Sequence, residues 1–289
     1  AIDSGMYTLA TVQNDAPFAY TNSGDGNDRL VKNWHEKTQG YKGLLNYREG
    51  IRNSRNVITV KAMTLVTPQV GMDYLLNFGF STLLSSTNAS GHTDVNQSLC
   101  LGGITNGVTN LEMTAAYAAI ANGGVYTKPI YYTKVLDGEG NIVLENKPES
   151  KTVLKETTAY LLTDAMKDVI TGANGTGGSC AISGQSVAGK TGTTSNYKDV
   201  WFVGYTPYYT AGVWAGYDMP TKLAKSEKNY HKALWKSVMS RIHETLENKK
   251  FEKPDDIVSV TVCSESGKRA VAGLCDCDQR GSMLKTEYF

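Results

Sequence analysis

The chain has 289 residues, 40% of them hydrophobic, and a formal net charge of +1. This length and composition allow a sizeable core, and the even charge balance excludes the basic excess that a nucleic-acid partner requires. No run of about 18 apolar residues is present, so no transmembrane helix is predicted. The first residues lack the charged and apolar regions of a signal peptide, and Ala1 is not a start methionine. We therefore expect a fragment of a longer protein.

The first part of the chain changes from polar to helical character near residue 47. Residues 1–46 are turn-rich and polar, with a loop over 22–27, and predict an irregular wall rather than a core. Over 47–66 the apolar positions show helical spacing with a polar interruption at 52–56. We expect two helices joined at that interruption.

Two further helices have clear starting signals. Pro68 stands at a favourable first helical position after Thr67, and the apolar stripe that follows ends at Gly79. Thr109 and Glu112 form a capping box before an alanine-rich segment, which predicts a tightly buried helix.

The second half mixes helices and strands. Apolar segments at 130–135 and 142–144 flank a glycine-containing turn and predict a hairpin, and 157–171 predicts an amphipathic helix. A last long helix is expected over 228–247, packed across a sheet. The stripe assigned to the sheet side of that helix is Tyr230, Leu234, Val238, Ile242 and Leu246.

A charged linker separates the main region, 1–248, from a tail over 249–289. The tail holds Cys263, Cys275 and Cys277. A bridge from Cys263 to either of the other two would close a short ring in a segment too small to build its own core. Three reduced thiols are the alternative.

Residues 184–194, Gly-Gln-Ser-Val-Ala-Gly-Lys-Thr-Gly-Thr-Thr, fit two incompatible catalytic signatures. One is the phosphate-binding loop G-x-x-x-x-G-K-[ST], with Lys190 as its lysine. The other is the triplet Lys190-Thr191-Gly192, which matches the third motif of serine enzymes that react with penicillin.

The sequence around the triplet favours the second signature. A glycine-rich run precedes it, and β-branched and aromatic segments follow at 200–205 and 209–217. These predict an antiparallel meander with Lys190 on its first strand, whereas a phosphate loop would require a helix directly after the lysine. Trp201 and Trp214 are expected in the core of this sheet.

A second motif of the same enzymes, Ser-x-Asn, is supplied by Ser54-Arg55-Asn56 at the predicted helix break. Alone, such a triplet is a common polar interruption of a helix. Together with the Lys-Thr-Gly strand, it makes the chain resemble the transpeptidase domain of class A, bifunctional penicillin-binding proteins of Gram-positive type. The segments 107–117 and 198–207 are similar to that family, as is the closing 286–289.

The resemblance implies an α+β fold of the penicillin-binding protein and serine β-lactamase type. In that fold an antiparallel sheet is flanked by helices and joined to an all-helical subdomain. The resemblance also implies catalytic roles: Ser54 relays a proton toward the leaving nitrogen, Lys190 polarises its hydroxyl, and Asn56 holds the substrate amide and the catalytic lysine.

Thr191, Gly192 and Thr193 are expected to bind the substrate. The hydroxyls of Thr191 and Thr193 can hydrogen-bond a terminal carboxylate that the charge of Lys190 attracts. Because Gly192 has no side chain, a peptide can approach the strand edge as an added strand, and the Thr193 N–H can donate to an oxyanion.

The first motif of the family, Ser-x-x-Lys with the nucleophile, is not found before Ser54. Two matches, beginning at Ser195 and Ser282, follow Lys190 in non-helical surroundings and are rejected. The nucleophile is therefore expected on a segment upstream of Ala1.

The favoured function is a D,D-transpeptidase that cross-links peptidoglycan stem peptides ending in D-Ala-D-Ala and is inhibited by β-lactams. Its parent is expected to be membrane-anchored, with the domain on the extracytoplasmic face. No cofactor is expected, and His35, His92, His231 and His243 have no spacing for a metal or a triad. A β-lactamase, a catalytically silent β-lactam or cell-wall sensor, and a phosphate-loop enzyme are the alternatives.

Overall fold

The computed structural model describes residues 1–21, 26–34 and 40–289. Among these, one sheet is built from β9 (Ala188–Thr193), β10 (Asp199–Tyr205) and β11 (Thr210–Gly216), in the order β11-β10-β9. Both pairings are antiparallel, which confirms the predicted meander. Part of the predicted loop over 22–27, and His35, lie outside the described residues.

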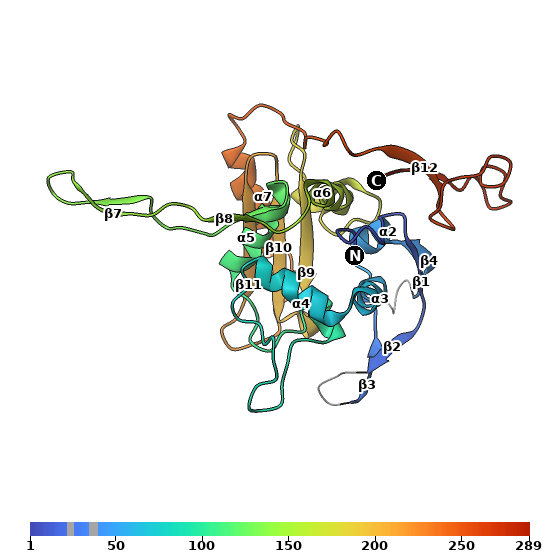
Figure 1. Cartoon of the computed structure of the whole chain (residues 1–289), viewed down its shortest axis with the longest axis horizontal. Helices are drawn as coiled ribbons and strands as arrows, with labels where there is room; N and C mark the ends of the chain where they lie inside the picture. The colour runs from blue at the N-terminus through green and yellow to red at the C-terminus, as the bar shows by residue number, and fades with distance from the viewer. Residues whose placement is uncertain (22–25, 35–39) are drawn as a thin grey trace.

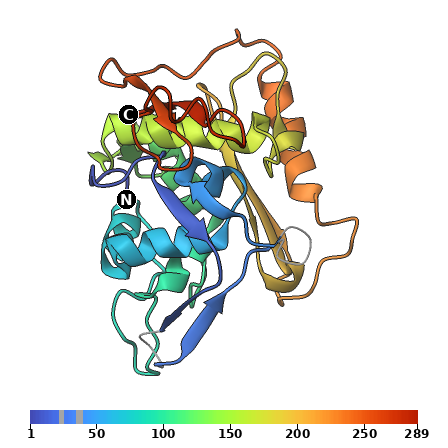
Figure 2. The same ribbon diagram turned by 90° about the vertical axis from the view of Figure 1, so that its right-hand side faces the viewer.

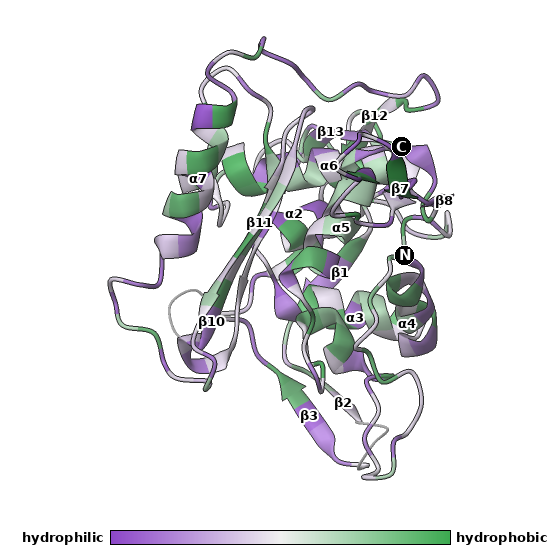
Figure 3. Cartoon of the chain, turned by 90° about the vertical axis from the view of Figure 1, so that its left-hand side faces the viewer, coloured by the Kyte–Doolittle hydropathy of each residue, from purple (hydrophilic) through white to green (hydrophobic). Residues whose placement is uncertain are grey.

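Helices cover both faces of this sheet. Helix α7 (Tyr230–Ile242) lies along one face, while α5 (Asn110–Ala121) and α6 (Glu156–Thr171) lie on the other (Figures 1 and 3). The central strand β10 is buried on both sides because Val200, Phe202 and Tyr205 all pack into cores. The predicted α+β fold is therefore confirmed.

Helix α7 presents a different face to the sheet from the one predicted. Its buried residues are His231, Trp235 and Met239, whereas Val238 is 46% exposed and Tyr230, Leu234 and Ile242 are also exposed. Trp235 packs edge-on against Phe202, with the ring centroids 4.9 Å apart. The predicted and the observed stripes are offset by one residue and have the same helical spacing. The observed stripe packs on the sheet because it contains the bulky Trp235.

The all-helical part contains α2 (Tyr47–Arg52), α3 (Asn56–Val66), α4 (Pro68–Asn77), the 3-10 turn η1 (Gln97–Leu101) and the start of α5. The break between α2 and α3 confirms the predicted interruption. Pro68 opens α4 and the capping box of Thr109 and Glu112 opens α5, both as predicted, and the Thr67 side chain also caps α4. A separate apolar core that includes Met72, Phe80 and Leu99 holds these helices together.

The prediction that residues 1–46 form only an irregular wall is wrong. Short strands pair as β1 (Val12–Asp15) with β4 (Gly43–Asn46), and as β2 (Phe18–Thr21) with β3 (Asp28–Val31). Leu9 and Asp15 are fully buried. The strands are too short and polar for alternation in the sequence to reveal them.

A second hairpin projects from the body of the molecule (Figure 1). It consists of β6 (Lys134–Leu136) and β7 (Ile142–Glu145), and it is inserted between two short strands that pair with each other, β5 (Val125–Thr127) and β8 (Ser150–Thr152). The predicted hairpin is confirmed, with a first strand that begins only at Lys134 and a second that extends to Glu145. No helix of the described residues is long and apolar enough to cross a bilayer.

The tail forms its own pair, β12 (Ser259–Cys263) with β13 (Leu284–Tyr288). The chain termini lie near one another (Figures 1 and 2), and Ile2 and Tyr288 belong to one apolar cluster. Cys263, Cys275 and Cys277 are free thiols, so the structure contains the reduced alternative rather than the bridge.

Arg48 of α2 connects three parts of the chain. Its guanidinium bonds Asp164 at 2.7 Å and Asp168 at 3.1 Å on α6, and Glu287 at 2.6 Å on β13. Its Nε also donates to Glu287, which makes that pair bidentate. The charged side chains hold the pKa of Arg48 above its usual value despite burial, which opposes it. This network fixes α2, and therefore the helix break that follows it.

We expect Arg48→Met to destabilise the intact parent protein by about 3–5 kcal/mol, because it leaves buried carboxylates without their partner. The matched control is Lys285→Met, which removes a partly exposed 3.0 Å pair with Glu49. That change is expected to cost less than about 1 kcal/mol. Urea unfolding measures both, and equal small losses would contradict the assigned role of Arg48.

The observed face of α7 gives a second prediction. Trp235→Ala is expected to destabilise the protein by about 3–5 kcal/mol because it opens a cavity against Phe202. Val238→Ala, on the exposed stripe, is expected to cost less than about 1 kcal/mol. The two variants are compared by urea unfolding, and a larger loss at Val238 would mean that the other face is the packed one.

Candidate active site

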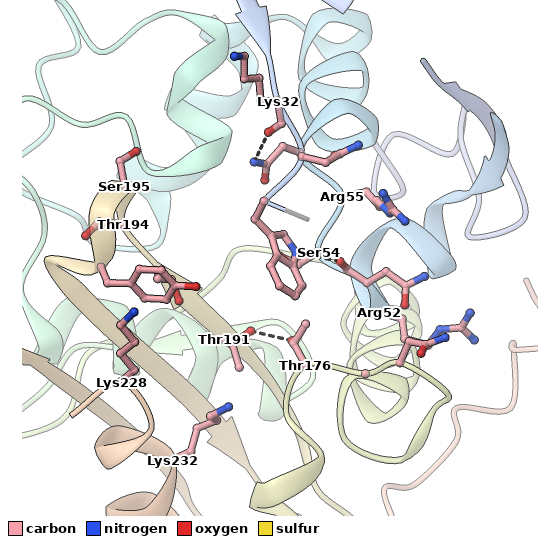
Figure 4. Close-up of a pocket in the computed structure, with 18 of the residues that line it drawn as sticks. Lys32, Arg52, Ser54, Arg55, Thr176, Thr191, Thr194, Ser195, Lys228 and Lys232 are labelled. Carbon is pink, nitrogen blue, oxygen red and sulfur yellow. Dashed lines mark hydrogen bonds between the residues drawn. The ribbon is translucent and has the colours of Figure 1, made fainter. Parts of the chain in front are cut away.

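A cleft of about 1090 Å³ opens between the α2–α3 break, β9 and the start of α7 (Figure 4). Ser54 and Asn56 line it from the break, and Thr191 and Thr193 line it from β9. The structure therefore brings residues from both predicted motifs to one cleft, although they are far apart in the sequence.

The helix break holds Ser54 in an unusual backbone conformation. Its φ of 51° lies in the left-handed region, which is strained for a residue with a side chain and recurs at functional sites. The next residue, Arg55, is 1% exposed and anchors the break through Asp15 at 3.3 Å and the Gly40 carbonyl at 3.0 Å. Burial of this arginine fixes where the Ser54 hydroxyl points.

Lys190 joins the two motifs. Its Nζ donates to Ser54 Oγ at 2.7 Å and to the Thr191 carbonyl at 3.2 Å. Burial lowers the pKa of the Lys190 ammonium from its ordinary value to about 8, because removing water disfavours the charged form. A lysine with such a pKa can exchange a proton with the Ser54 hydroxyl near neutral pH.

The outer edge of β9 pairs with no other described strand, since β10 occupies its inner edge. Thr191 and Thr193 point to the cleft side, and Thr191 Oγ1 lies 2.7 Å from Thr176 Oγ1. Gly192 alternates with them, and a Cβ there would lie 3.1 Å from the Trp201 Cβ. The close approach of Trp201 therefore also favours glycine at position 192, and the sequence did not reveal this contact.

Asn56 stands at the first position of α3, on the wall of the cleft. Its Nδ2 donates to the Lys32 carbonyl at 2.8 Å (Figure 4). No hydrogen bond from Asn56 to Lys190 is present in the described part of the chain. The predicted role of Asn56 toward the substrate amide therefore stays a prediction.

The start of α7 supplies a wall that the motifs did not predict. Lys228, His231 and Lys232 line the cleft, and Lys228 Nζ lies 3.7 Å from the centroid of the Tyr197 ring. His231 is 3% exposed, and burial with the nearby charge of Lys232 lowers the pKa of its imidazole to about 4. The only sequence signal is its spacing of four residues from Trp235.

Other expectations for this region need correction. Trp201 and Trp214 were expected in the core, but neither is buried, and Trp214 is 39% exposed with its Nε1 donating to Asp199 at 3.1 Å. They pair across neighbouring strands on a partly open face of the sheet, with ring centroids 6.4 Å apart.

The phosphate-loop alternative is wrong. Gly189 and Lys190 lie inside β9, and a single 3-10 turn, η3 (Ser195–Tyr197), leads directly into β10. A phosphate loop requires helical N–H groups after the lysine, and no such helix follows here.

Comparisons with known proteins agree with this geometry. Residues 1–242 match the family described as penicillin binding protein transpeptidase domain, and residues 253–289 match the penicillin-binding protein 1A, C-terminal domain. The chain therefore belongs to the penicillin-binding protein transpeptidase family. The predicted family is confirmed.

Among similar proteins, penicillin-binding protein 1A of Clostridium tetani is 34% identical over 295 residues, covering 100% of this chain and 36% of that protein. Penicillin-binding protein 1A/1B of Bacillus subtilis is 31% identical, covering 96% of this chain and 30% of that protein. The chain thus spans about a third of these relatives. The structure of penicillin-binding protein 1A from Haemophilus influenzae, 21% identical, shares the fold with a TM-score of 0.77 over 98% of this chain and 45% of that one.

The lowered pKa of Lys190 predicts a pH-dependent stability difference. Burial disfavours the charged form, so Lys190 of the folded protein loses its proton above a pH of about 8, whereas in the unfolded chain it keeps the proton up to the ordinary value of 10.5. Relative to Lys190→Met, the wild-type protein should therefore gain stability as pH rises from about 8 to 10.5. Urea unfolding across that range measures this, with the exposed Lys236→Met as the control. A difference that does not change with pH would contradict the burial of the ammonium.

Proposed function

We propose that this chain is the major part of a D,D-transpeptidase domain that cross-links peptidoglycan stem peptides ending in D-Ala-D-Ala by serine acyl transfer. The observation that carries the proposal is the 2.7 Å hydrogen bond from Lys190 to Ser54 beside the free edge of β9. Acyl transfer needs a nucleophile, a proton route to the leaving amine and donors for the oxyanion. Two of these three are available from residues of this chain.

In the proposed reaction, a serine hydroxyl attacks the carbonyl of the penultimate D-alanine. The peptide bond breaks, and the terminal D-alanine leaves with a proton that Ser54 relays to its nitrogen. The Lys190 ammonium polarises the Ser54 hydroxyl, and its pKa of about 8 suits proton exchange near neutral pH. Asn56 is proposed to orient the substrate amide from the opposite wall.

The substrate is proposed to lie along β9 as an added strand. In this pose the hydroxyls of Thr191 and Thr193 bond its terminal carboxylate, and the Thr193 N–H donates to the oxyanion. Gly192 has no side chain to block the approach of the peptide, and the hydrogen bond between Thr176 and Thr191 holds the Thr191 hydroxyl in place. A β-lactam, which carries a carboxylate beside its reactive amide, would bind in the same way.

The nucleophile is proposed to come from a Ser-x-x-Lys segment upstream of Ala1. An apolar cavity of about 250 Å³, lined by Ala1 itself and by Gly50, Ile51 and Leu162, lies against α2, the helix that ends shortly before Ser54. An amphipathic helix preceding Ala1 could fill this cavity with its apolar side and present its polar side to Lys190. Relatives about three times as long are consistent with such a segment.

The parent protein is proposed to be membrane-anchored and to work on the extracytoplasmic face, where peptidoglycan is assembled. The support for this location is the similarity to penicillin-binding protein 1A, whose homologues act on the cell wall outside the cytoplasmic membrane. A proposed glycan-polymerising domain would account for part of the remaining length.

A labelled penicillin tests the proposal. It is expected to acylate the intact parent at the upstream serine and to leave this chain alone unmodified. Ser54→Ala and Lys190→Ala in the parent should each slow acylation by about 10²-fold or more, since each removes part of the proton route. Gel fluorescence and peptide mapping measure the rate and the site.

Ser282→Ala is the matched control, because that serine belongs to a rejected Ser-x-x-Lys match and does not line the cleft, and the variant protein should be acylated as fast as the wild-type protein. Label on Ser195 or Ser282 would contradict the proposal. Acylation without cross-linking of stem peptides would favour a sensor, and rapid release of the label would favour a β-lactamase.

A further inference from the structure

The cleft is larger and more cationic than one terminal carboxylate requires. Besides the β9 subsite, its charged lining includes Lys32, Lys42, Arg52, Arg55, Lys228 and Lys232, against a single carboxylate, Glu49. Arg55 is paired with Asp15, and Glu49 is paired with Arg52 and Lys285. The positive charges without a carboxylate partner therefore belong to other residues of the cleft lining.

The start of α7 concentrates unneutralised positive charge. No described carboxylate lies within ion-pair distance of Lys228 or Lys232, and no side chain caps the helix at Asn229. A helix N-terminus already carries a partial positive charge, so lysines at its first turn are electrostatically unfavourable unless an anion is nearby. In Figure 4, Lys228 and Lys232 approach the cleft from the side opposite Arg52.

His231 provides an independent sign of a ligand. It is 3% exposed and lines the cleft between the two lysines, yet its Nδ1 has no hydrogen-bond partner among the described residues. Buried polar atoms are nearly always paired, and each orphan calls for an explanation. Because that nitrogen is itself buried, an anion held by Lys228 and Lys232 reaches it only when the side chains over it move aside, and a neutral imidazole with its proton on Nδ1 then donates to the anion.

We propose that Lys228, His231 and Lys232 form a second anion subsite, which binds a side-chain carboxylate of the stem peptide. The inference rests on the proposed function, in which Thr191 and Thr193 hold the terminal carboxylate of the same peptide. The two subsites face one cleft, so a peptide with carboxylates at both its end and a side chain bridges them. The enzyme thereby prefers the acidic stem peptide to its amidated form.

The test compares two synthetic peptides ending in D-Ala-D-Ala that differ only in one side-chain group, a carboxylate or its amide. With the intact parent protein, the acidic peptide is expected to bind and to release D-alanine about tenfold more efficiently at low salt, mainly through KM. The double variant Lys228→Met with Lys232→Met should bring the ratio close to one. Arginine at both positions should restore it.

The matched control is Lys225→Met with Lys236→Met, which removes the same charge from exposed positions and should preserve the ratio. An unchanged ratio in the Lys228 and Lys232 variant, or no preference in the wild-type protein, would overturn the second subsite. Titration calorimetry with both peptides measures binding without catalysis, so it distinguishes a failure of the second subsite from a failure of the proposed function. A binding preference that the variant abolishes, without D-alanine release by the wild-type protein, would support the subsite and refute the transpeptidase.

Discussion

The hydrogen bond between the Lys190 ammonium and the Ser54 hydroxyl is the contact on which the site depends. It joins the edge of the sheet to a break between two helices, and the cleft opens beside this junction. Neighbouring structure fixes the position of both Lys190 and Ser54. Lys190 belongs to a strand in full register with β10, and Ser54 lies beside an arginine whose buried ion pair with Asp15 fixes the break. A partly buried polar junction of this kind tolerates little displacement because few water molecules can replace a lost partner.

Distant parts of the chain support that junction. Arg48 connects the helix before the break with α6 and with the closing strand of the tail, so the tail contributes to the position of Ser54 without approaching the cleft. On the other side, Trp235 seats α7 against the sheet and brings Lys228 and Lys232 to the wall. The same packing that stabilises the fold therefore determines the charge of the cleft.

Local signals in the sequence predicted local structure well. The capping box at Thr109, the proline after Thr67 and the aromatic run through β10 each specify an element by chemistry confined to a few residues. The meeting of Ser54 and Lys190 was also predictable, but through the resemblance to a family rather than from spacing. The face of α7 was not, because two apolar stripes had the same period and only the space over Gly204 and Phe202 distinguishes them. The strands of the first 46 residues and the burial of His231 depend on tertiary contacts that no short pattern encodes.

The most direct measurement is a crystal structure of the intact parent protein acylated by penicillin. The account predicts an ester to a serine upstream of Ala1, with the antibiotic's carboxylate about 3 Å from the hydroxyls of Thr191 and Thr193 and with Ser54 still bonded to Lys190. A carboxylate bound away from β9, or Ser54 and Lys190 separated with no shared cleft, would contradict it.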